Sequence, residues 1–259
     1  MSTTRLSRCC TAFVLQVVFC LAPFLCLGAT FTVNPSGDAF VTSGPSGNLS
    51  GNNYGGAGSL SVAAPGSPQG EFQSVLKFSL AGARSFFDGM YGTGQWSVES
   101  VTLALTSVAP GNPLFNQNRA GQFNISWMAN AGWTEGSGKP TLPGTVGITF
   151  NTLPGFLGPQ DQSLGTFGFS GVTGGTTTYN LNLASGLVTD ILSGTDLSLR
   201  LNAADTSVSA LFASRTNVRN TLGRPLLTIV AVPEPGSFGL GTLGLGVFFG
   251  GRLLNRIRR

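Results

Sequence analysis

The stretch VLKFSL, residues 75–80, decides the fold class because apolar residues recur in it at every second position. Successive side chains of a β-strand point to opposite faces, so this spacing places Leu76, Phe78 and Leu80 on one face. The opposite face is mostly polar and carries Lys77. A strand with one apolar and one mostly polar face is typical of an antiparallel sheet that is packed on one side.

The same period of two recurs in four further stretches, at 101–106, 123–128, 197–202 and 227–230. Clusters rich in Gly, Pro, Ser and Asn separate these stretches, at 43–58, 64–70, 109–113, 136–144 and 171–175. Short strands with such spacers favour an all-β fold, an antiparallel β-sandwich or jelly roll, over any α/β fold.

One short helix is expected at about 184–192. Its apolar residues fall at helical spacing, and Gly194 sits where a C-terminal cap belongs; they are Ala184, Leu187, Val188, Ile191 and Leu192. We expect this helix to cover one end of the sandwich.

The first 29 residues have the three parts of a secretory signal peptide. Arg5 and Arg8 precede an almost wholly apolar stretch at 9–27, and the small residues Gly28 and Ala29 follow. This arrangement predicts a signal helix with cleavage after Gly28 or Ala29, and an uncleaved N-terminal anchor is the alternative. All four cysteines lie in this leader, so the mature chain would have no disulfide and no thiolate metal site.

The last 28 residues, 232–259, combine a proline-flanked glutamate, an apolar run and a basic end. The two prolines predict a stiff, exposed connector at 233–235 that cannot continue a strand. The sixteen uncharged residues at 236–251 would cover about 24 Å as a helix, less than the roughly 30 Å hydrocarbon core. We therefore predict a marginal transmembrane helix at about 236–254. Four arginines that follow the uncharged run would keep the C-terminus in the cytoplasm and the body outside: Arg252, Arg256, Arg258 and Arg259.

This order of V-P-E-P, a short Gly/Leu/Phe span and a terminal arginine cluster resembles the PEP-CTERM sorting signal of Gram-negative bacteria. The resemblance implies that exosortase, a membrane transpeptidase, cuts at a motif formed by Val232, Pro233, Glu234 and Pro235. The inner membrane would then be a transient anchor, and the chain would end at the cell surface or in the extracellular matrix. An ordinary C-terminal membrane tail is the alternative.

Residues 30–231 read as one domain, with no second boundary. Between residues 29 and 231 there are eight basic and nine acidic residues, and eight minus nine leaves a net charge of −1. The basic isoelectric point therefore comes from the termini, and it does not predict a nucleic-acid partner.

Several short motifs follow one another along this body. They are Asp38-Ala-Phe-Val, Asn53-Tyr-Gly, Leu76-Lys-Phe, Trp133-Thr-Glu-Gly, Phe212-x-Ser-Arg and Arg224-Pro-Leu-Leu. Their order resembles the DNRLRE-type β-sandwich domain of bacterial surface and polysaccharide-active proteins. Lys77 stands where that family often has arginine, and the insertion at 84–96 is long. Some members of the family bind carbohydrate, and many have no assigned activity.

The chain contains no histidine, which excludes Ser-His-Asp and Cys-His nucleophiles and a His-ligated zinc. We predict no cofactor and no metal. Glu135 with a second acid could form a glycosidase pair, but a structural corner, with Trp133 buried and Glu135 bonding the backbone, is the favoured interpretation. Asp205 with Asn202 is read as a turn rather than a calcium site.

A sugar-binding face needs exposed aromatic rings. The candidates are Tyr54, Tyr91, Trp96, Trp133 and Tyr179, and for each the alternative is a place in the core. Trp127 lies on the apolar side of its strand and is expected in the core.

Taken together, these features predict an exported, non-enzymatic surface or matrix protein associated with exopolysaccharide or biofilm. A carbohydrate-binding module that acts on matrix polysaccharide is the second hypothesis. A polysaccharide hydrolase or lyase is the third, and no pair of acids stands out to support it.

Overall fold

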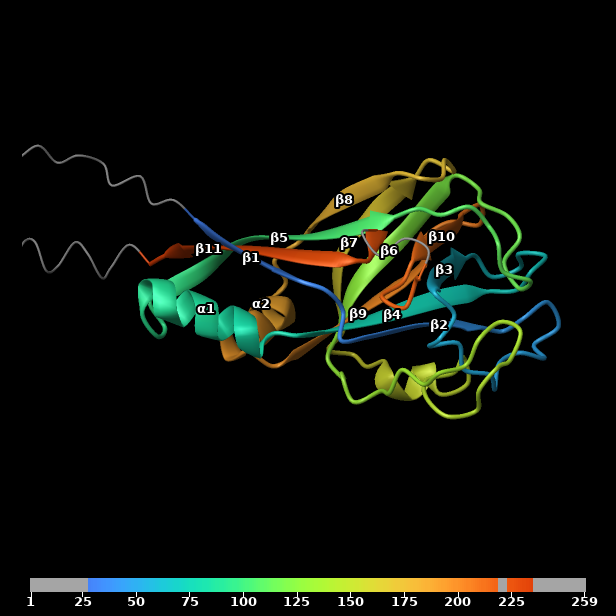
Figure 1. Ribbon diagram of the computed structural model, residues 1–259, viewed down its shortest axis with the longest axis horizontal. Helices are drawn as coiled ribbons and strands as arrows, with labels where there is room; N and C mark the ends of the chain where they lie inside the picture. The colour runs from blue at the N-terminus through green and yellow to red at the C-terminus, as the bar shows by residue number, and fades with distance from the viewer. Residues whose placement is uncertain (1–27, 219–222, 235–259) are drawn as a thin grey trace, which may run out of the picture.

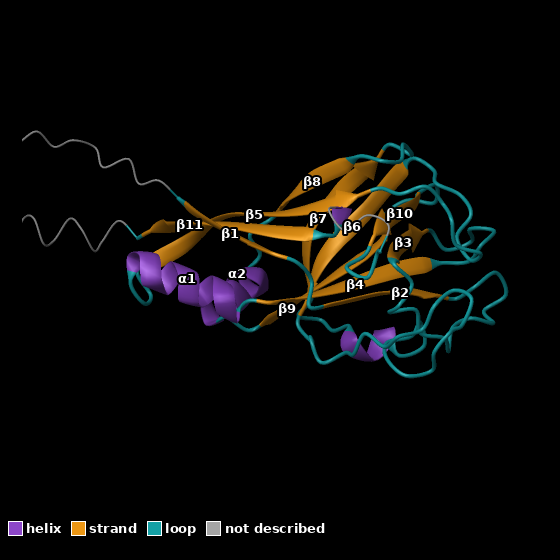
Figure 2. Ribbon diagram, viewed as in Figure 1, coloured by secondary structure: helices purple, strands orange, loops and turns teal. Residues whose placement is uncertain are grey.

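The computed structural model describes residues 28–218 and 223–234, which form two antiparallel sheets with two α-helices at one end (Figures 1 and 2). The four-stranded sheet has the order β1 (Ala29–Val33), β11 (Leu226–Pro233), β5 (Trp96–Thr106) and β8 (Thr176–Leu181). The seven-stranded sheet has the order β10 (Ser209–Ala213), β3 (Ser59–Ala63), β4 (Phe72–Ser79), β9 (Asp196–Ala203), β6 (Gly121–Met128) and β7 (Gln162–Phe169). Strand β2 (Gly37–Thr42) pairs with β4 outside this order.

All five stretches with a period of two are strands, so the predicted all-β sandwich is confirmed. The apolar face of each points into a core between the two sheets. In β9 this face consists of Leu197, Leu199 and Leu201, which are all fully buried. The matching face of β11 contributes Leu227 and Ile229 to the same core.

The expectation of one solvated face is wrong for β4, which is buried on both sides for most of its length. Val75, on the side away from the main core, packs in a second cluster with Trp133, Ile148 and Leu153. The long segment after β6, which contains the 3₁₀ helix η1 (Leu153–Phe156), supplies these residues and covers this face of the sheet.

The predicted short helix is confirmed as α2 (Ser185–Ser193), and Gly194 ends it in the left-handed conformation. A second helix, α1 (Ala81–Tyr91), occupies most of the stretch that was read as an insertion. It buries Ala83 and Phe87, one turn apart. The two helices are joined by the Arg84 guanidinium, which donates to the carbonyl of Ser193 at the end of α2 (3.0 Å).

Both ends of the described chain lie at the same end of the molecule, beside α1 (Figure 1). They lie together because β1 and β11 are antiparallel neighbours, with Ala29 opposite Ala231. The predicted signal helix, the predicted membrane span at 236–254 and the arginines after it fall outside the described residues. Among the described residues, no helix is long and apolar enough to cross a membrane.

Candidate functional site

Polar residues from four of the sequence motifs meet in one partly buried network. They are Asp38 at the start of β2, Asn53, Glu135 and Arg215. Because the four positions are far apart in the chain, only the packing of the loops on the seven-stranded sheet brings them together.

The Arg215 guanidinium and the Glu135 carboxylate form a two-pronged ion pair. The Nε of Arg215 donates to Oε1 of Glu135 (2.8 Å), and a terminal guanidinium nitrogen donates to Oε2. The same Oε1 accepts the backbone N–H of Asp38 (3.1 Å). Bidentate pairing between a guanidinium and a carboxylate adds geometric specificity as well as energy. Because Glu135 also accepts the N–H of Asp38, the pair holds the segment around Arg215 against the start of β2.

Asp38 is the acid with the most perturbed environment in this network. Its side chain is fully buried, and Oδ2 accepts the backbone N–H of Arg215 (2.7 Å), while Oδ1 has no partner. Burial raises the pKa of Asp38 to about 7; the bond from Arg215 opposes this rise, and the neighbouring Glu135 carboxylate adds to it. Asp38 therefore carries a proton in the folded protein under weakly acidic conditions.

Asn53 uses its whole hydrogen-bonding capacity, with three bonds to the loop at 135–148 and one to Gly55. Its Nδ2 donates to the carbonyls of Glu135 (2.7 Å) and Ile148 (2.8 Å), and its Oδ1 accepts the N–H groups of Gly55 (3.2 Å) and Gly138 (3.1 Å). The two backbones approach so closely that a Cβ on Gly138 would lie 1.9 Å from the carbonyl oxygen of Asn53. The loop is therefore fixed to the sandwich through backbone contacts that only glycine permits.

Trp133 completes this corner. Its ring is buried, its Nε1 donates to Ser198 Oγ (2.7 Å), and the Lys77 ammonium lies 4.7 Å from the ring centroid and donates to the Trp133 carbonyl. The interpretation of W-T-E-G as a structural corner is confirmed. Neither Asp38 nor Glu135 lines the two cavities described below, so the geometry gives a glycosidase pair no support.

The structure places four of the five candidate sugar-stacking rings in the core. Tyr54, Trp96, Trp133 and Tyr179 are at most 4% exposed, so the expectation of an exposed ring face is wrong for them. The fifth, Tyr91, is partly buried, and its hydroxyl accepts the N–H of Ala29 (2.7 Å) and donates to the carbonyl of Ala231 (3.1 Å). Trp127 is partly buried against the main core. These rings are used for packing, as aromatic side chains most often are.

A groove with a cavity volume of about 780 Å³ lies over the start of β3 and the middle of β10. Its walls are the segments at 56–58, 108–112, 137–139 and 216–218. The network holds two of these walls, because Glu135 lies two residues before the wall at 137–139 and Arg215 directly precedes the wall at 216–218. Direct bonds also join the walls: Gly56 N–H donates to the Gly138 carbonyl (2.8 Å), and Gly58 N–H donates to Thr216 Oγ1 (3.2 Å). The sequence patterns did not predict this groove.

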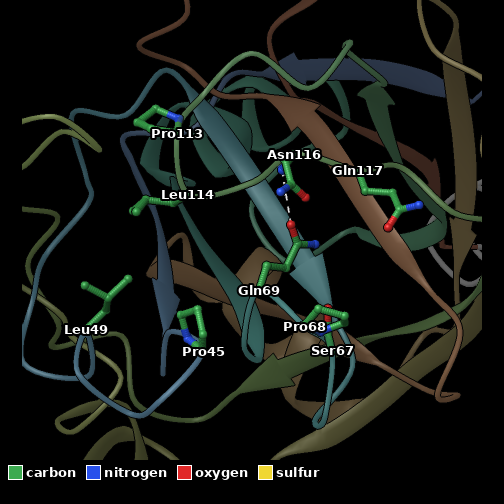
Figure 3. A pocket seen from close by; sticks show the side chains of 9 residues that line it. All are labelled: Pro45, Leu49, Ser67, Pro68, Gln69, Pro113, Leu114, Asn116 and Gln117. Carbon is green, nitrogen blue, oxygen red and sulfur yellow. Dashed lines mark hydrogen bonds between the residues drawn. The ribbon is translucent and has the colours of Figure 1, made fainter.

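A second cavity, of about 200 Å³, is lined by prolines and by the amides of Gln69, Asn116 and Gln117 (Figure 3). Gln69 is bonded at both ends: Oε1 accepts the N–H of Asn116 (3.1 Å), and Nε2 donates to Ser209 Oγ (2.9 Å). The Gln69 side chain is therefore committed to the fold.

Asp205 is a turn residue, as predicted. Its Oδ1 accepts the N–H groups of Ser207 (2.9 Å) and Val208 (2.8 Å), and its Oδ2 accepts that of Gln122 (2.6 Å). Among residues 28–218 and 223–234, no three acidic, histidine or cysteine side chains gather as a metal site would require.

The start of the predicted sorting motif, Val232 and Pro233, belongs to β11 instead of a free connector. Val232 and Pro233 pair with Ser97 and Trp96 of β5, and the N–H of Glu234 donates to the Gln95 carbonyl (2.9 Å). The prediction that prolines end the strand before this point is therefore wrong. Strand β1 pairs with β11 only as far as Ala231, so Pro233 has a partner strand on one side, the edge setting in which proline is tolerated. Pro235 lies outside the described residues.

Comparisons with known proteins add no family. No protein-family model matches the chain, and no curated protein matches it. Among solved structures, one from Desmodium yellow mottle tymovirus aligns with 80% of this chain and 89% of its own, at 9% identity and a TM-score of 0.24. A structure of infectious bursal disease virus, Gx strain, aligns with 81% of this chain and 37% of its own, at 10% identity and a TM-score of 0.19.

Proposed function

We propose that this chain is an exported, non-enzymatic surface or matrix protein. Its leader at 1–29 directs it across the inner membrane, the span at about 236–254 holds it there, and exosortase cuts it at Val232–Pro235. The released body then associates with exopolysaccharide. The proposal rests on the two terminal signals in the sequence and on one structural observation.

That observation is the placement of the two ends of the body. Ala29 lies opposite Ala231 on neighbouring strands, and both ends leave the fold beside α1 (Figure 1). A leader and a C-terminal span that enter the same membrane need this arrangement, because each is joined to the body through only a few residues. The rest of the sandwich then projects away from the membrane.

Of the two expected cleavage positions, we favour the one after Gly28. Cleavage there keeps Ala29, which opens β1 and whose N–H donates to the Tyr91 hydroxyl (2.7 Å). The same hydroxyl donates to the carbonyl of Ala231 (3.1 Å), the residue before the sorting motif. Tyr91 therefore joins the mature N-terminus to the strand that carries the motif.

This connection has a consequence for processing. Val232 and Pro233 pair with β5, so an enzyme that binds the motif needs the end of β11 to separate from β5. The free energy of this local opening would set how often the motif is accessible. Bonds that hold the end of β11 then slow cleavage.

Replacing Tyr91 by phenylalanine is expected to speed cleavage. It removes the hydrogen bonds of the hydroxyl to Ala29 and Ala231, each worth about 1 kcal/mol, which corresponds to a roughly 5–30-fold change in the opening equilibrium. The measurement is a pulse-chase time course of conversion to the shorter product in a host with the sorting machinery. Tyr54→Phe is the matched control, because its hydroxyl bonds to Asn52 Nδ2 (3.1 Å) and it lies in a separate aromatic cluster.

The two possible failures are distinct. A wild-type chain that is never shortened would contradict the sorting proposal. Shortening at the same rate in wild type and Tyr91→Phe would leave sorting intact and would contradict the role of Tyr91.

A further inference from the structure

We propose that the outer face of α1, formed by Ser85, Phe86, Gly89 and Met90, lies on the surface of a phospholipid bilayer while the chain is attached to the membrane. This contact rests on the proposed function, because the predicted span at 236–254 is what brings α1 to the membrane. It differs from the span in being made by the folded body. It also needs no cleavage at the sorting motif.

The outer face of α1 is exposed and uncharged. Phe86 and Met90 are four residues apart, so they lie on the same side of the helix, and they are 38% and 59% exposed. The Ser85 hydroxyl donates to the Ala81 carbonyl within the helix (3.0 Å), so it does not depend on water for a partner. The face can therefore leave water at little cost, and burial of its two large apolar side chains is favourable.

The two charged residues of α1 are engaged away from this face. The Arg84 guanidinium donates to the Ser193 carbonyl (3.0 Å) and pairs with the Asp88 carboxylate (3.4 Å). Asp88 also accepts the ring N–H of Trp96 (2.9 Å). From residue 89 to residue 98 the chain carries no charged side chain. With no basic cluster on it, this surface would bind lipid by inserting apolar side chains and not by attraction to anionic headgroups.

The C-terminal end of α1 lies where both chain ends leave the body (Figure 1). The Tyr91 hydroxyl is bonded to the first residue of β1 and to β11. The N–H of Glu234 donates to the carbonyl of Gln95, four residues beyond Tyr91 (2.9 Å). The uncharged run of the predicted span starts at residue 236, so roughly 7 Å of extended chain at most separates it from Glu234. A bilayer entered there lies within reach of Met90, which directly precedes Tyr91.

Phe86 attaches this face to the rest of the body. The centroid of its ring lies 5.7 Å from that of Phe31 in β1 and 5.3 Å from that of Phe87, which is buried in the main core. The face therefore cannot move independently of the sandwich. With the span as one attachment and α1 as the other, the body would keep one orientation on the membrane until the chain is cut.

The test is fluorescence of the full chain in phosphatidylcholine vesicles, either ordinary or brominated near the glycerol end of the acyl chains. Bromine quenches tryptophan only at close range, so a tryptophan introduced on α1 reports contact with lipid. An interfacial helix lies about 5–10 Å deep, at the level of these bromine atoms, so we expect the fluorescence added by Met90→Trp to fall about twofold or more in brominated vesicles. The three native tryptophans are a background common to all variants.

Val172→Trp is the matched control for position. Val172 is 70% exposed, and its carbonyl accepts a bond from Ser107, which directly follows β5. It therefore lies at the end of β5 opposite Trp96 and the chain ends. The fluorescence added by Val172→Trp should be the same in ordinary and brominated vesicles.

Gly89→Asp tests whether the contact is apolar. A side chain at Gly89 would meet nothing within 4 Å apart from the helix's own backbone, so the substitution leaves the packing intact. A charge is costly to bury in lipid, so Gly89→Asp should abolish most of the quenching seen with Met90→Trp. Gly89→Asn has the same shape without the charge and should keep most of it.

Flotation of the vesicles separates the two possible failures. A full chain that does not float with the vesicles would contradict the proposed membrane attachment, and the contact of α1 with it. A chain that floats, but is quenched equally with Met90→Trp and Val172→Trp, would leave the attachment intact and would overturn the contact of α1. Equal quenching with Gly89→Asp and Gly89→Asn would overturn it as well.

Discussion

Replacing Asn53 by alanine is expected to destabilise the folded protein by about 3–5 kcal/mol. The change removes the side-chain partner of four backbone groups, two carbonyls and two N–H groups, and three of these four bonds are fully buried. Each unpaired buried group costs about 1–3 kcal/mol, and local relaxation recovers part of the sum. Urea unfolding of the two chains, followed by fluorescence of the buried tryptophans, measures the difference.

The adjacent residue supplies the control. Asn52 is partly buried, and its Nδ2 donates to the Tyr54 hydroxyl. Asn52→Ala should therefore cost about 1 kcal/mol or less. If Asn53→Ala unfolds within 1 kcal/mol of wild type, the loop at 135–148 is not held as described.

Replacing Asp38 by asparagine is expected to change how stability depends on pH. Burial raises the pKa of Asp38 from 3.8 to about 7, so between these values the folded state keeps a proton that the unfolded state has lost. The wild-type protein therefore loses stability as the pH rises from about 4 to about 7. A shift of this size corresponds to a loss on the order of 4 kcal/mol. Asparagine has no proton to lose, so the variant should be markedly more stable than wild type at pH 8.

Urea unfolding at pH 5, 6, 7 and 8 tests this prediction through the difference between the variant and wild type. The groups that face Asp38 are Glu135 and Arg215, and both stay in place in the variant. Asp196→Asn, at an exposed position, is the control and should leave the pH profile unchanged. A difference that stays constant from pH 5 to pH 8 would mean that Asp38 is ionised in the folded protein throughout.

The sequence predicted secondary structure best where the apolar residues of a segment follow a single clear spacing. The alternation in 197–202 predicted β9 because each leucine of the pattern faces the same core. Gly194 marked the end of α2 because a left-handed residue is needed there. By contrast, α1 contains two glycines and buries only Ala83 and Phe87, so its helical pattern is too sparse to recognise.

The remaining features depend on contacts between distant segments. A sequence pattern cannot tell an exposed Tyr54 or Trp133 from a buried one, because the loops that cover them come from elsewhere in the chain. The prolines at 233 and 235 predicted a free connector, yet β5 supplies a partner for Pro233. The groove is formed by five separate segments, so no single motif indicates it.

The central claim is that the two terminal segments are export and sorting signals removed from a self-contained body. Its most direct test is the intact mass of the protein recovered outside the cytoplasm of a host with the sorting machinery. We expect a single species that begins at Ala29 and lacks the residues after about Pro235. Recovery of a chain that still carries Arg259 would contradict the claim.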